Sequence, residues 1–417
     1  MQKIRIRGGI PLRGIIKISG AKNAILPAIA ASILTEEEII LENVPNVKDV
    51  YTMLEILNVL GGAWEKLNGK IKIRMKDIKT PRAPYELVKT MRASILVMGP
   101  LLSRFKKAEI SHPGGCAIGL RPIDLHLEGL KALGASIKQE FGYDIAESKR
   151  LIGTEYEFKK VTVTGTENLV MAATLAEGMT LLLNCAKEPE VIDLIKLLNK
   201  MGAKIEGAGT ERILIEGVKK LNGTRHSVIS DRIETGTYMV ASAITGGELK
   251  LENVNTEIME NIIIPLKNAG AEVGVISNNE IIVKGNKPIN PLEMETAPYP
   301  GFPTDMQAQF VALLTQADGI SKVKETIFSS RFHHVSELVR MGAKIEVDGD
   351  KAIIYGKTQL QGAEVMANDL RASASLVLAG LVAKGETIID RVYHLDRGYE
   401  KMEEKLRGVG AEIERIE

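Results

Sequence analysis

Met201-Gly202-Ala203-Lys204-Ile205-Glu206 recurs unchanged as Met341-Gly342-Ala343-Lys344-Ile345-Glu346. The same Gly-Ala step, followed by a short strand-like segment, occurs four more times along the chain. Six glycines therefore mark one repeated position, namely Gly62, Gly134, Gly202, Gly270, Gly342 and Gly410. Successive glycines in this series lie 68 or 72 residues apart, so the sequence predicts six copies of one unit.

Each copy has the same expected order of elements. An Ala-rich helix is followed by a short strand, a second and amphipathic helix, the marker glycine and a further strand. A glycine suits the left-handed position that ends a helix. A unit of about 70 residues is larger than a solenoid repeat, so we predict compact α/β units, three to a domain. The segments are Ala-rich helices at 24–34 and 172–176, strands at 39–42, 181–184 and 249–253, and amphipathic helices at 50–60, 191–201 and 258–269.

Composition excludes several classes of protein. The 417 residues contain 54 Lys and Arg against 53 Asp and Glu, which argues against a nucleic-acid binder driven by bulk charge. The longest apolar stretch, 376–383, is far shorter than a membrane span, and residues 1–7 alternate like a strand without a signal core. Cys116 and Cys185 form neither a disulfide framework nor a zinc motif, and we expect a cytoplasmic protein.

Polar clusters stand at the predicted start of every Ala-rich helix. Asp, Asn, Ser and Thr there are explained by helix capping, and capping alone accounts for Thr166 and Ser230. Lys and Arg are not explained in this way, because the helix dipole disfavours cations at that end. An anion bound where these helix ends meet would account for Lys22, Arg92 and Arg371. The six clusters are 22–23, 90–92, 166–168, 230–232, 304–305 and 369–371.

One segment, 111–126, departs from the repeat because three glycines and two prolines flank Cys116. This is the composition of a loop, and long loops in compact units are often lids. Arg121 nearby favours the thiolate and hence a reactive thiol. The alternative, a small buried hydrophobic residue, fits Cys185 in its apolar strand better than Cys116.

A second departure, 297–309, places three prolines before Asp305 at a helix entrance. Asp305 is therefore either a helix cap or a positioned general base. Arg397 precedes a further helix, and Arg331 occupies the corresponding place one repeat earlier. His333 and His334 are adjacent, which is a poor spacing for a shared metal ion, and we expect solvated helix-entry histidines.

These segments together resemble the enolpyruvyl transferase family over essentially the whole chain. That family's fold implies an α/β protein of two similar domains, each with three βαβαββ-type repeats in an inside-out α/β barrel, with the active site in the interdomain cleft. It also implies residues 22–229 as one domain and residues 1–21 with 230–417 as the other. The motifs are 20–23, 113–116, 121–126, 231–237, 302–309, 369–374 and 396–399.

The resemblance implies transfer of the enolpyruvyl group of phosphoenolpyruvate to the 3′-hydroxyl of UDP-N-acetylglucosamine. Phosphate leaves after addition and elimination through a tetrahedral ketal, in the first committed step of peptidoglycan synthesis. The family implies no metal and no organic cofactor, and it makes the loop thiol a target of fosfomycin. The expected partners are the two substrates, without nucleic acid and without membrane insertion.

The resemblance also assigns roles to residues. Cys116 would be the proton donor and Asp305 the base, with Lys22 and Arg397 as further catalytic cations. Residues 162–165 read Thr-Val-Thr-Gly where some members have Ser-Val-Gly-Ala, which is a departure at the sugar-nucleotide contacts. The substrate-binding set would be Lys22, Asn23, Arg92, Arg121, Pro122, Ile123, Asp124, Leu125, Lys160, Thr162, Val163, Asp305, Ile327, Arg331, Arg371 and Arg397.

Two alternatives stay open on the sequence. One is the family's enolpyruvylshikimate phosphate synthase, which shares the fold and the donor; the Cys116 loop and Arg121-Pro122-Ile123-Asp124 favour the UDP-sugar enzyme over it. The other is a repeat-built scaffold or a binding protein for anionic metabolites. It would bind ligand without releasing phosphate, and it leaves Cys116 and the proline-braced Asp305 unexplained.

Overall fold

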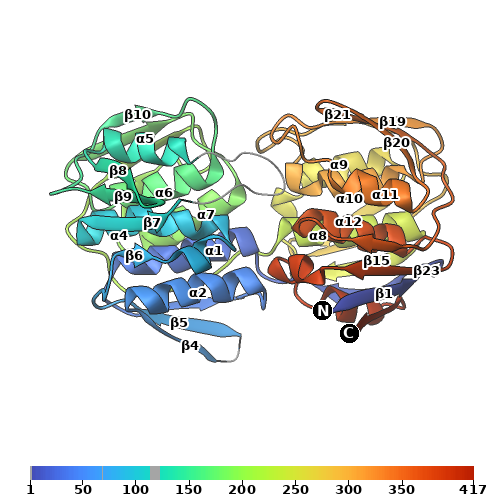
Figure 1. The fold of residues 1–417 in the computed structure, drawn as a ribbon, viewed down its shortest axis with the longest axis horizontal. Helices are drawn as coiled ribbons and strands as arrows, with labels where there is room; N and C mark the ends of the chain where they lie inside the picture. Colours follow the sequence, from blue (N-terminus) through green and yellow to red (C-terminus); the bar gives the residue numbers. More distant parts are fainter. Residues whose placement is uncertain (1, 68, 113–122) are drawn as a thin grey trace. The chain divides into compact units, whose positions relative to one another are not determined.

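The computed structural model describes residues 2–67, 69–112 and 123–417 of the chain, which form two compact units (Figure 1). The terminal unit contains the described residues 2–19 and 230–417. The inserted unit contains the described residues between them, 20–67, 69–112 and 123–229. The chain therefore leaves the terminal unit once, builds the inserted unit, and returns.

The described chain contains six four-stranded sheets of one topology, three in each unit. In every sheet an edge strand pairs in parallel with its neighbour, and the remaining two pairings are antiparallel. The sixfold repeat predicted from the Gly-Ala steps is thereby confirmed as an α/β repeat.

In the terminal unit, β1 closes the third sheet by pairing with β23 on one side and β24 on the other. Its sequence alternates, so Ile4 and Ile6 are fully buried while the charged residues between them face outward. The sheets are β2 (Arg13–Lys17), β15 (Glu248–Glu252), β17 (Glu280–Lys284) and β16 (Glu272–Ser277); β18 (Glu293–Glu295), β19 (Ile320–Lys324), β21 (Lys351–Tyr355) and β20 (Lys344–Asp348); and β22 (Glu364–Met366), β23 (Glu386–Asp390), β1 (Lys3–Arg7) and β24 (Glu412–Ile416).

In the inserted unit, the first sheet is completed from both ends of the segment, because β14 pairs in parallel with β3 almost 200 residues earlier. The sheets are β14 (Thr224–Ser227), β3 (Ile39–Glu42), β5 (Lys70–Arg74) and β4 (Ala63–Leu67); β6 (Arg82–Ala83), β7 (Lys107–Ser111), β9 (Tyr143–Glu147) and β8 (Ser136–Glu140); and β10 (Glu155–Glu157), β11 (Met179–Leu183), β13 (Arg212–Glu216) and β12 (Lys204–Glu206).

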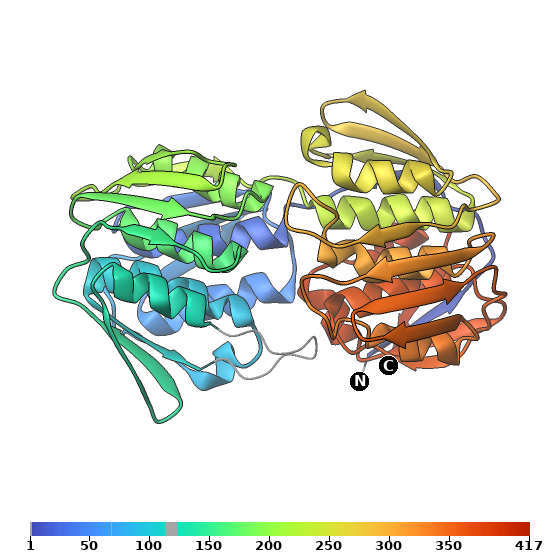
Figure 2. The same ribbon diagram turned by 90° about the horizontal axis from the view of Figure 1, so that it is seen from above.

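One helix of each repeat is buried on all sides and forms the centre of its unit. Small and apolar residues around the whole circumference allow this, and all fourteen residues of α8 are buried. In Figure 2 the yellow-green α8 runs alongside the yellow α9, with the strands outside them. These central helices are α1 (Lys22–Ala31), α4 (Met98–Phe105) and α6 (Val163–Ala173) in the inserted unit, and α8 (Arg232–Thr245), α10 (Gln307–Leu314) and α12 (Leu370–Gly380) in the terminal unit.

The second helix of each repeat is amphipathic and covers the core from outside, as predicted. Most of these helices are followed within three residues by a glycine with positive φ, which lets the chain turn into the next strand. They are α2 (Lys48–Leu60), α5 (Asp124–Ala132) and α7 (Pro189–Lys200), and α9 (Glu260–Asn268), α11 (His334–Arg340) and α13 (Met402–Arg407). The short helices are η1 (Ser32–Leu34), α3 (Tyr85–Val88), η2 (Arg92–Val97), η3 (Thr256–Ile258), η4 (Thr304–Met306) and η5 (Val392–Arg397).

Several sequence predictions were wrong. The cap of α8 is Asp231 and not Ser230, because the Asp231 carboxylate accepts hydrogen bonds from the Ile233 and Glu234 amides. The helix expected at 172–176 begins nine residues earlier, because Thr162 caps it by accepting a hydrogen bond from the Gly165 amide. The cluster 166–168 is therefore buried inside α6 and does not stand at its start. His334 is buried, whereas His333 is exposed as expected, because α11 packs against α12.

No helix among residues 2–67, 69–112 and 123–417 is long and apolar enough to cross a bilayer.

Candidate functional site

The terminal unit brings three of the predicted site residues into direct contact. Asp305 lies in η4, Arg331 in the turn before α11, and Arg371 in the first turn of α12. Nη1 of Arg331 lies 2.8 Å from Oδ1 of Asp305, and Nη2 of Arg371 lies 2.9 Å from Oδ2. Each carboxylate oxygen therefore has its own guanidinium partner.

Both guanidinium groups are withdrawn from solvent. Arg331 is 6% exposed and Arg371 is 2% exposed. Nε and Nη1 of Arg371 are buried and make no hydrogen bond. Although burial opposes its charge, Asp305, Tyr399 and Asp231 raise the pKa of Arg371 above its ordinary value. A buried, permanently charged guanidinium with two unused nitrogen donors is suited to hold an anion.

Tyr399 and Gln309 pack against this cluster and hold it in place. The Arg371 guanidinium lies over the Tyr399 ring, 5.4 Å from its centroid. The Tyr399 hydroxyl lies 2.8 Å from the Thr237 hydroxyl, and Nε2 of Gln309 donates to both oxygens and to the Asp305 carbonyl. Side chains from α8, α10 and the segment after η5 thus hold η4, which carries Asp305 and directly precedes α10, in one position.

Arg397 and Ile327 lie on segments that adjoin this cluster. Arg397 ends η5, which packs against α12. The backbone at the next residue, Gly398, lies close to the Leu370 side chain, because a Cβ on Gly398 would stand 2.5 Å from that side chain. Arg397 is half-buried, and after burial its charge is the main cause that lowers the pKa of His394. The Ile327 amide donates to Glu325 at 2.9 Å.

In the inserted unit, a buried histidine, His126, links segments that carry predicted site residues. Nδ2 of Asn168 lies 3.0 Å from Nδ1 of His126, and the Thr164 hydroxyl lies 3.2 Å from Nε2. Oδ1 of Asn168 accepts from the Gly99 amide, so its Nδ2 is the donor to His126. Nδ1 of His126 is therefore unprotonated, and Nε2–H donates to Thr164.

This network joins three of the predicted binding segments. His126 follows Asp124 and Leu125 in α5, and Thr164 follows Thr162 and Val163 at the start of α6. Nδ2 of Asn168 also donates to the carbonyl of Ile95 in η2, the short helix that begins at Arg92. Burial and, to a smaller extent, the charge of Arg92 lower the pKa of His126 to about 3, so the imidazole is neutral at pH 7.

The remaining predicted residues of the inserted unit lie at its helix starts. Lys22 is the first residue of α1, and its Nζ lies 3.5 Å from Oδ2 of Asp49 in α2. Asn23 follows Lys22 and is half-buried, Ile123 is buried before α5, and Lys160 is exposed just before α6. Cys116, Arg121 and Pro122 lie outside the described residues.

Two buried acidic groups were not predicted to be functional from the sequence. Glu167 belongs to the polar cluster 166–168, but its burial in α6 was not expected; burial, with the nearby charges of Glu190 and Glu188, raises its pKa well above its ordinary value. Glu325 of the terminal unit is buried after β19. Glu325 stands in no unusual motif, and only its tertiary contacts distinguish it from a surface glutamate.

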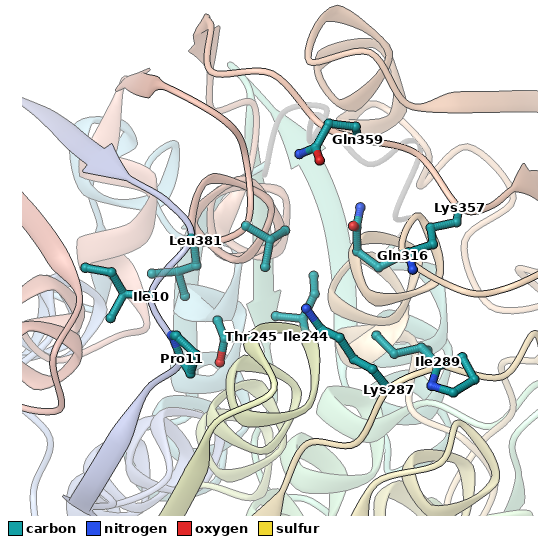
Figure 3. Close-up of a pocket in the computed structure, with 13 residues that line it drawn as sticks. Ile10, Pro11, Ile244, Thr245, Lys287, Ile289, Gln316, Lys357, Gln359 and Leu381 are labelled. Carbon is teal, nitrogen blue, oxygen red and sulfur yellow. The ribbon is translucent and has the colours of Figure 1, made fainter.

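A cavity of about 220 Å³ lies at the opposite end of the central helices of the terminal unit (Figure 3). Ile244, Lys287 and Gln316 surround it, together with segments that follow the central strands. α8 has fourteen residues, so this cavity is roughly 20 Å from the helix starts. It contains none of the predicted site residues, and we do not assign the reaction to it.

The family model and the similar full-length proteins are all named as carboxyvinyltransferases. The family model "EPSP synthase (3-phosphoshikimate 1-carboxyvinyltransferase)" matches residues 6–406. UDP-N-acetylglucosamine 1-carboxyvinyltransferase of Koribacter versatilis is 56% identical over all of this chain and 97% of its own length. The enzymes of that name from Acidobacterium capsulatum and Magnetococcus marinus are 54% and 55% identical over all of this chain, and over 96% and 100% of their own lengths.

Solved structures show the same fold at much lower identity. The enolpyruvyl transferase NikO from Streptomyces tendae superposes with a TM-score of 0.90 at 23% identity, covering 99% of this chain and 98% of its own. An EPSP synthase from Acinetobacter baumannii superposes with a TM-score of 0.77 at 21% identity over the whole of both chains. The repeat, the topology and the full-length relatives agree, and the chain belongs to the enolpyruvyl transferase family.

Proposed function

We propose that this chain transfers the enolpyruvyl group of phosphoenolpyruvate to the 3′-hydroxyl of UDP-N-acetylglucosamine and releases phosphate. The reaction is the first committed step of peptidoglycan synthesis. The observation that carries the proposal is Asp305 held between the buried Arg331 and Arg371, a base beside cations that suit an anionic donor. The full-length relatives at 54–56% identity support UDP-N-acetylglucosamine as the acceptor.

The donor accounts for the cations. Phosphoenolpyruvate carries a phosphate and a carboxylate, and guanidinium groups bind both kinds of oxyanion through paired hydrogen bonds. In the proposal, the cations that serve the donor are Lys22, Arg92, Arg121, Arg331, Arg371 and Arg397. The free N–H groups of Arg371 are the best supported of these contacts.

The chemistry is an addition followed by an elimination. In the addition, the sugar oxygen bonds to the central carbon of the donor, Asp305 takes the hydroxyl proton, and Cys116 gives a proton to the methylene carbon. In the elimination, the Cys116 thiolate takes a proton back from the new methyl group, the electrons of that carbon–hydrogen bond form the double bond, and the carbon–oxygen bond to phosphate breaks as the leaving phosphate takes the proton held by Asp305. Lys22 and Arg397 stabilise the negative charge that develops on the phosphate. No redox step occurs, and the proposal includes no metal or organic cofactor.

The inserted unit supplies the proposed acceptor contacts. Asn23 would contact the sugar, and the segments linked by His126 would contribute further contacts to the nucleotide. The residues of this set are Pro122, Ile123, Asp124, Leu125, Lys160, Thr162, Val163, Asp305 and Ile327. His126 supports this assignment, because it joins α5, α6 and η2 in one network.

We also propose that the functional domains run from 22 to 229 and over 1–21 with 230–417. The compact units, which change at residues 19/20 and 229/230, support these bounds. With two cysteines and no disulfide framework in the sequence, we place the reaction in the cytoplasm.

A phosphate-release assay tests the proposal. We expect phosphate release when phosphoenolpyruvate and UDP-N-acetylglucosamine are both present, and a product that is heavier than the sugar nucleotide by one enolpyruvyl group. The matched family model makes shikimate 3-phosphate the acceptor to compare. Turnover with shikimate 3-phosphate and none with the sugar nucleotide would overturn the assignment, and binding of both substrates without phosphate release would favour a binding protein.

A further inference from the structure

Glu325, which follows β19, is a buried carboxylate that accepts four side-chain hydrogen bonds from described residues. It is 1% exposed. Its Oε1 accepts from the Thr296 hydroxyl at 2.8 Å, the Ile327 amide at 2.9 Å and the Phe328 amide at 3.0 Å. Its Oε2 accepts from the Thr304 hydroxyl at 2.9 Å. An ionised carboxylate matches this set, because every partner is a donor.

The hydroxyl of Thr304 links Glu325 to Arg331 through two hydrogen bonds. A hydroxyl has one proton, and the carboxylate of Glu325 accepts it, so a lone pair of the same oxygen faces Arg331. Nη1 of Arg331 donates to that oxygen at 2.9 Å. The same nitrogen lies 2.8 Å from Oδ1 of Asp305. The charge on Glu325 thus sets the direction in which the Thr304 hydroxyl points, and Arg331, which can only donate, meets the lone pair that this leaves.

Glu325 also fixes the turn that carries Arg331. Its bonds to two consecutive amides hold the start of the segment between β19 and α11, and its bond to Thr296 holds the segment to the end of β18. The Thr326 amide donates to the Thr296 hydroxyl at 2.9 Å, which adds a second connection. One side chain therefore controls both the position and the hydrogen-bond partner of Arg331.

We propose that Glu325 is a positioning residue for the transfer reaction, acting through Thr304 and Arg331 on the carboxylate of Asp305. The inference rests on the proposed function. Glu325→Gln keeps the shape of the side chain but places an NH₂ group beside donors. With that NH₂ group facing Thr304, the hydroxyl must reorient and the bond from Arg331 weakens.

The test compares Glu325→Gln with Glu295→Gln, an exposed carboxylate on the neighbouring β18. Phosphate release is measured with phosphoenolpyruvate and UDP-N-acetylglucosamine, and thermal unfolding is measured for the same samples. We expect Glu325→Gln to lower kcat at least tenfold with the KM for UDP-N-acetylglucosamine changed less than threefold. Glu295→Gln should match the wild type within twofold.

Thr304 provides an independent route to the same conclusion. Thr304→Val removes the hydroxyl and should lower kcat about as much as Glu325→Gln, whereas Thr304→Ser keeps it and should retain most of kcat. In the double variant Glu325→Gln/Thr304→Val the losses should be less than multiplicative, because both interrupt one series of contacts. If Glu325→Gln does not fold, the two Thr304 variants decide.

The outcomes separate the two proposals. A wild-type protein that releases no phosphate from these substrates overturns the proposed function. An active wild type with Glu325→Gln or Thr304→Val of unchanged kcat overturns the positioning role. A lower unfolding temperature without a lower kcat identifies Glu325 as structural only and overturns it as well.

Discussion

Oδ2 of Asp305 and Nη2 of Arg371 lie 2.9 Å apart, and the guanidinium is only 2% exposed. The proposed base is therefore paired with a proposed donor-binding cation. An anionic donor that accepts hydrogen bonds from the two unused nitrogens of Arg371 would compete with Asp305 for the positive charge of this guanidinium. Donor binding and the state of the base are coupled through this one side chain.

Replacing Arg371 tests that coupling. Arg371→Met keeps much of the buried volume and removes the charge. We expect kcat/KM for phosphoenolpyruvate to fall by a cost of about 2–5 kcal/mol, or about 30-fold to 5,000-fold. The Kd of UDP-N-acetylglucosamine, measured by calorimetry on the free protein, should change little. A large loss of sugar-nucleotide affinity with donor use intact would contradict the assignment.

The two cysteines should differ in reactivity. Burial raises the pKa of Cys185 to about 12, and the residue is 1% exposed, so almost no thiolate is available at pH 7. We expect fosfomycin to give a single adduct on Cys116, located by peptide mass spectrometry. Cys185→Ser should be labelled like the wild type and Cys116→Ser should not be labelled. Modification of Cys185 in the folded protein would contradict this expectation.

His126 should make the inserted unit less stable in acid. Its folded pKa of about 3 is below the ordinary 6.5, so between these values the unfolded state binds a proton that the folded state does not. Stability is complete above pH 6.5 and falls with pH below it, by about 2 kcal/mol for this group at pH 5.

Urea unfolding at pH 5, 6, 7 and 8 measures the slope. His126→Asn should remove the contribution of this group, and the exposed His333→Asn should keep it. A wild-type curve that is unchanged by His126→Asn would show that the imidazole does not remain neutral in the folded state.

We expect Lys405 to stabilise the terminal unit by pairing with the buried carboxylate of Glu234 in α8. Nζ of Lys405 lies 2.6 Å from Oε1 of Glu234, whose Oε2 accepts from the Ser19 amide at 2.7 Å. Burial raises the pKa of Glu234, and Lys405 lowers it. Lys405→Met leaves this carboxylate unpaired and should destabilise the terminal unit by about 3 kcal/mol.

The double variant Lys405→Met/Glu234→Gln should recover part of that stability, because no buried charge remains. Thermal unfolding of the single and double variants measures the difference. Equal melting temperatures for the wild type and Lys405→Met would contradict the buried pairing.

The repeat was predictable from the sequence because it leaves a local signal. Each marker glycine follows an amphipathic helix and precedes an alternating strand, and both patterns can be recognised within about twenty residues. The start of α6 was missed for the opposite reason. Thr162, Thr166 and Asn168 are all plausible caps by type, and only the bond from Gly165 to Thr162 distinguishes them.

The cationic positions were predictable and their contacts were not. Arg331 and Arg371 stand out because cations are unusual at helix starts. That both meet Asp305 depends on contacts between residues about 26 and 66 positions apart in the chain, which no local pattern records. Glu325 and the neutral His126 were beyond prediction, since their roles arise from burial and from the direction of hydrogen bonds.

The pairing of β1 with β23 and β24 has a consequence for biosynthesis. Strand β1 is made roughly 380 residues or more before its partners β23 and β24, while the described strands within residues 20–229 pair only with one another. At about 5–20 residues per second, strand β1 waits roughly 20–80 seconds for its neighbours. We expect the inserted unit to fold first, so that stalled nascent chains ending soon after its exit yield a protease-resistant core from 20 to 229 and a cleavable leading segment.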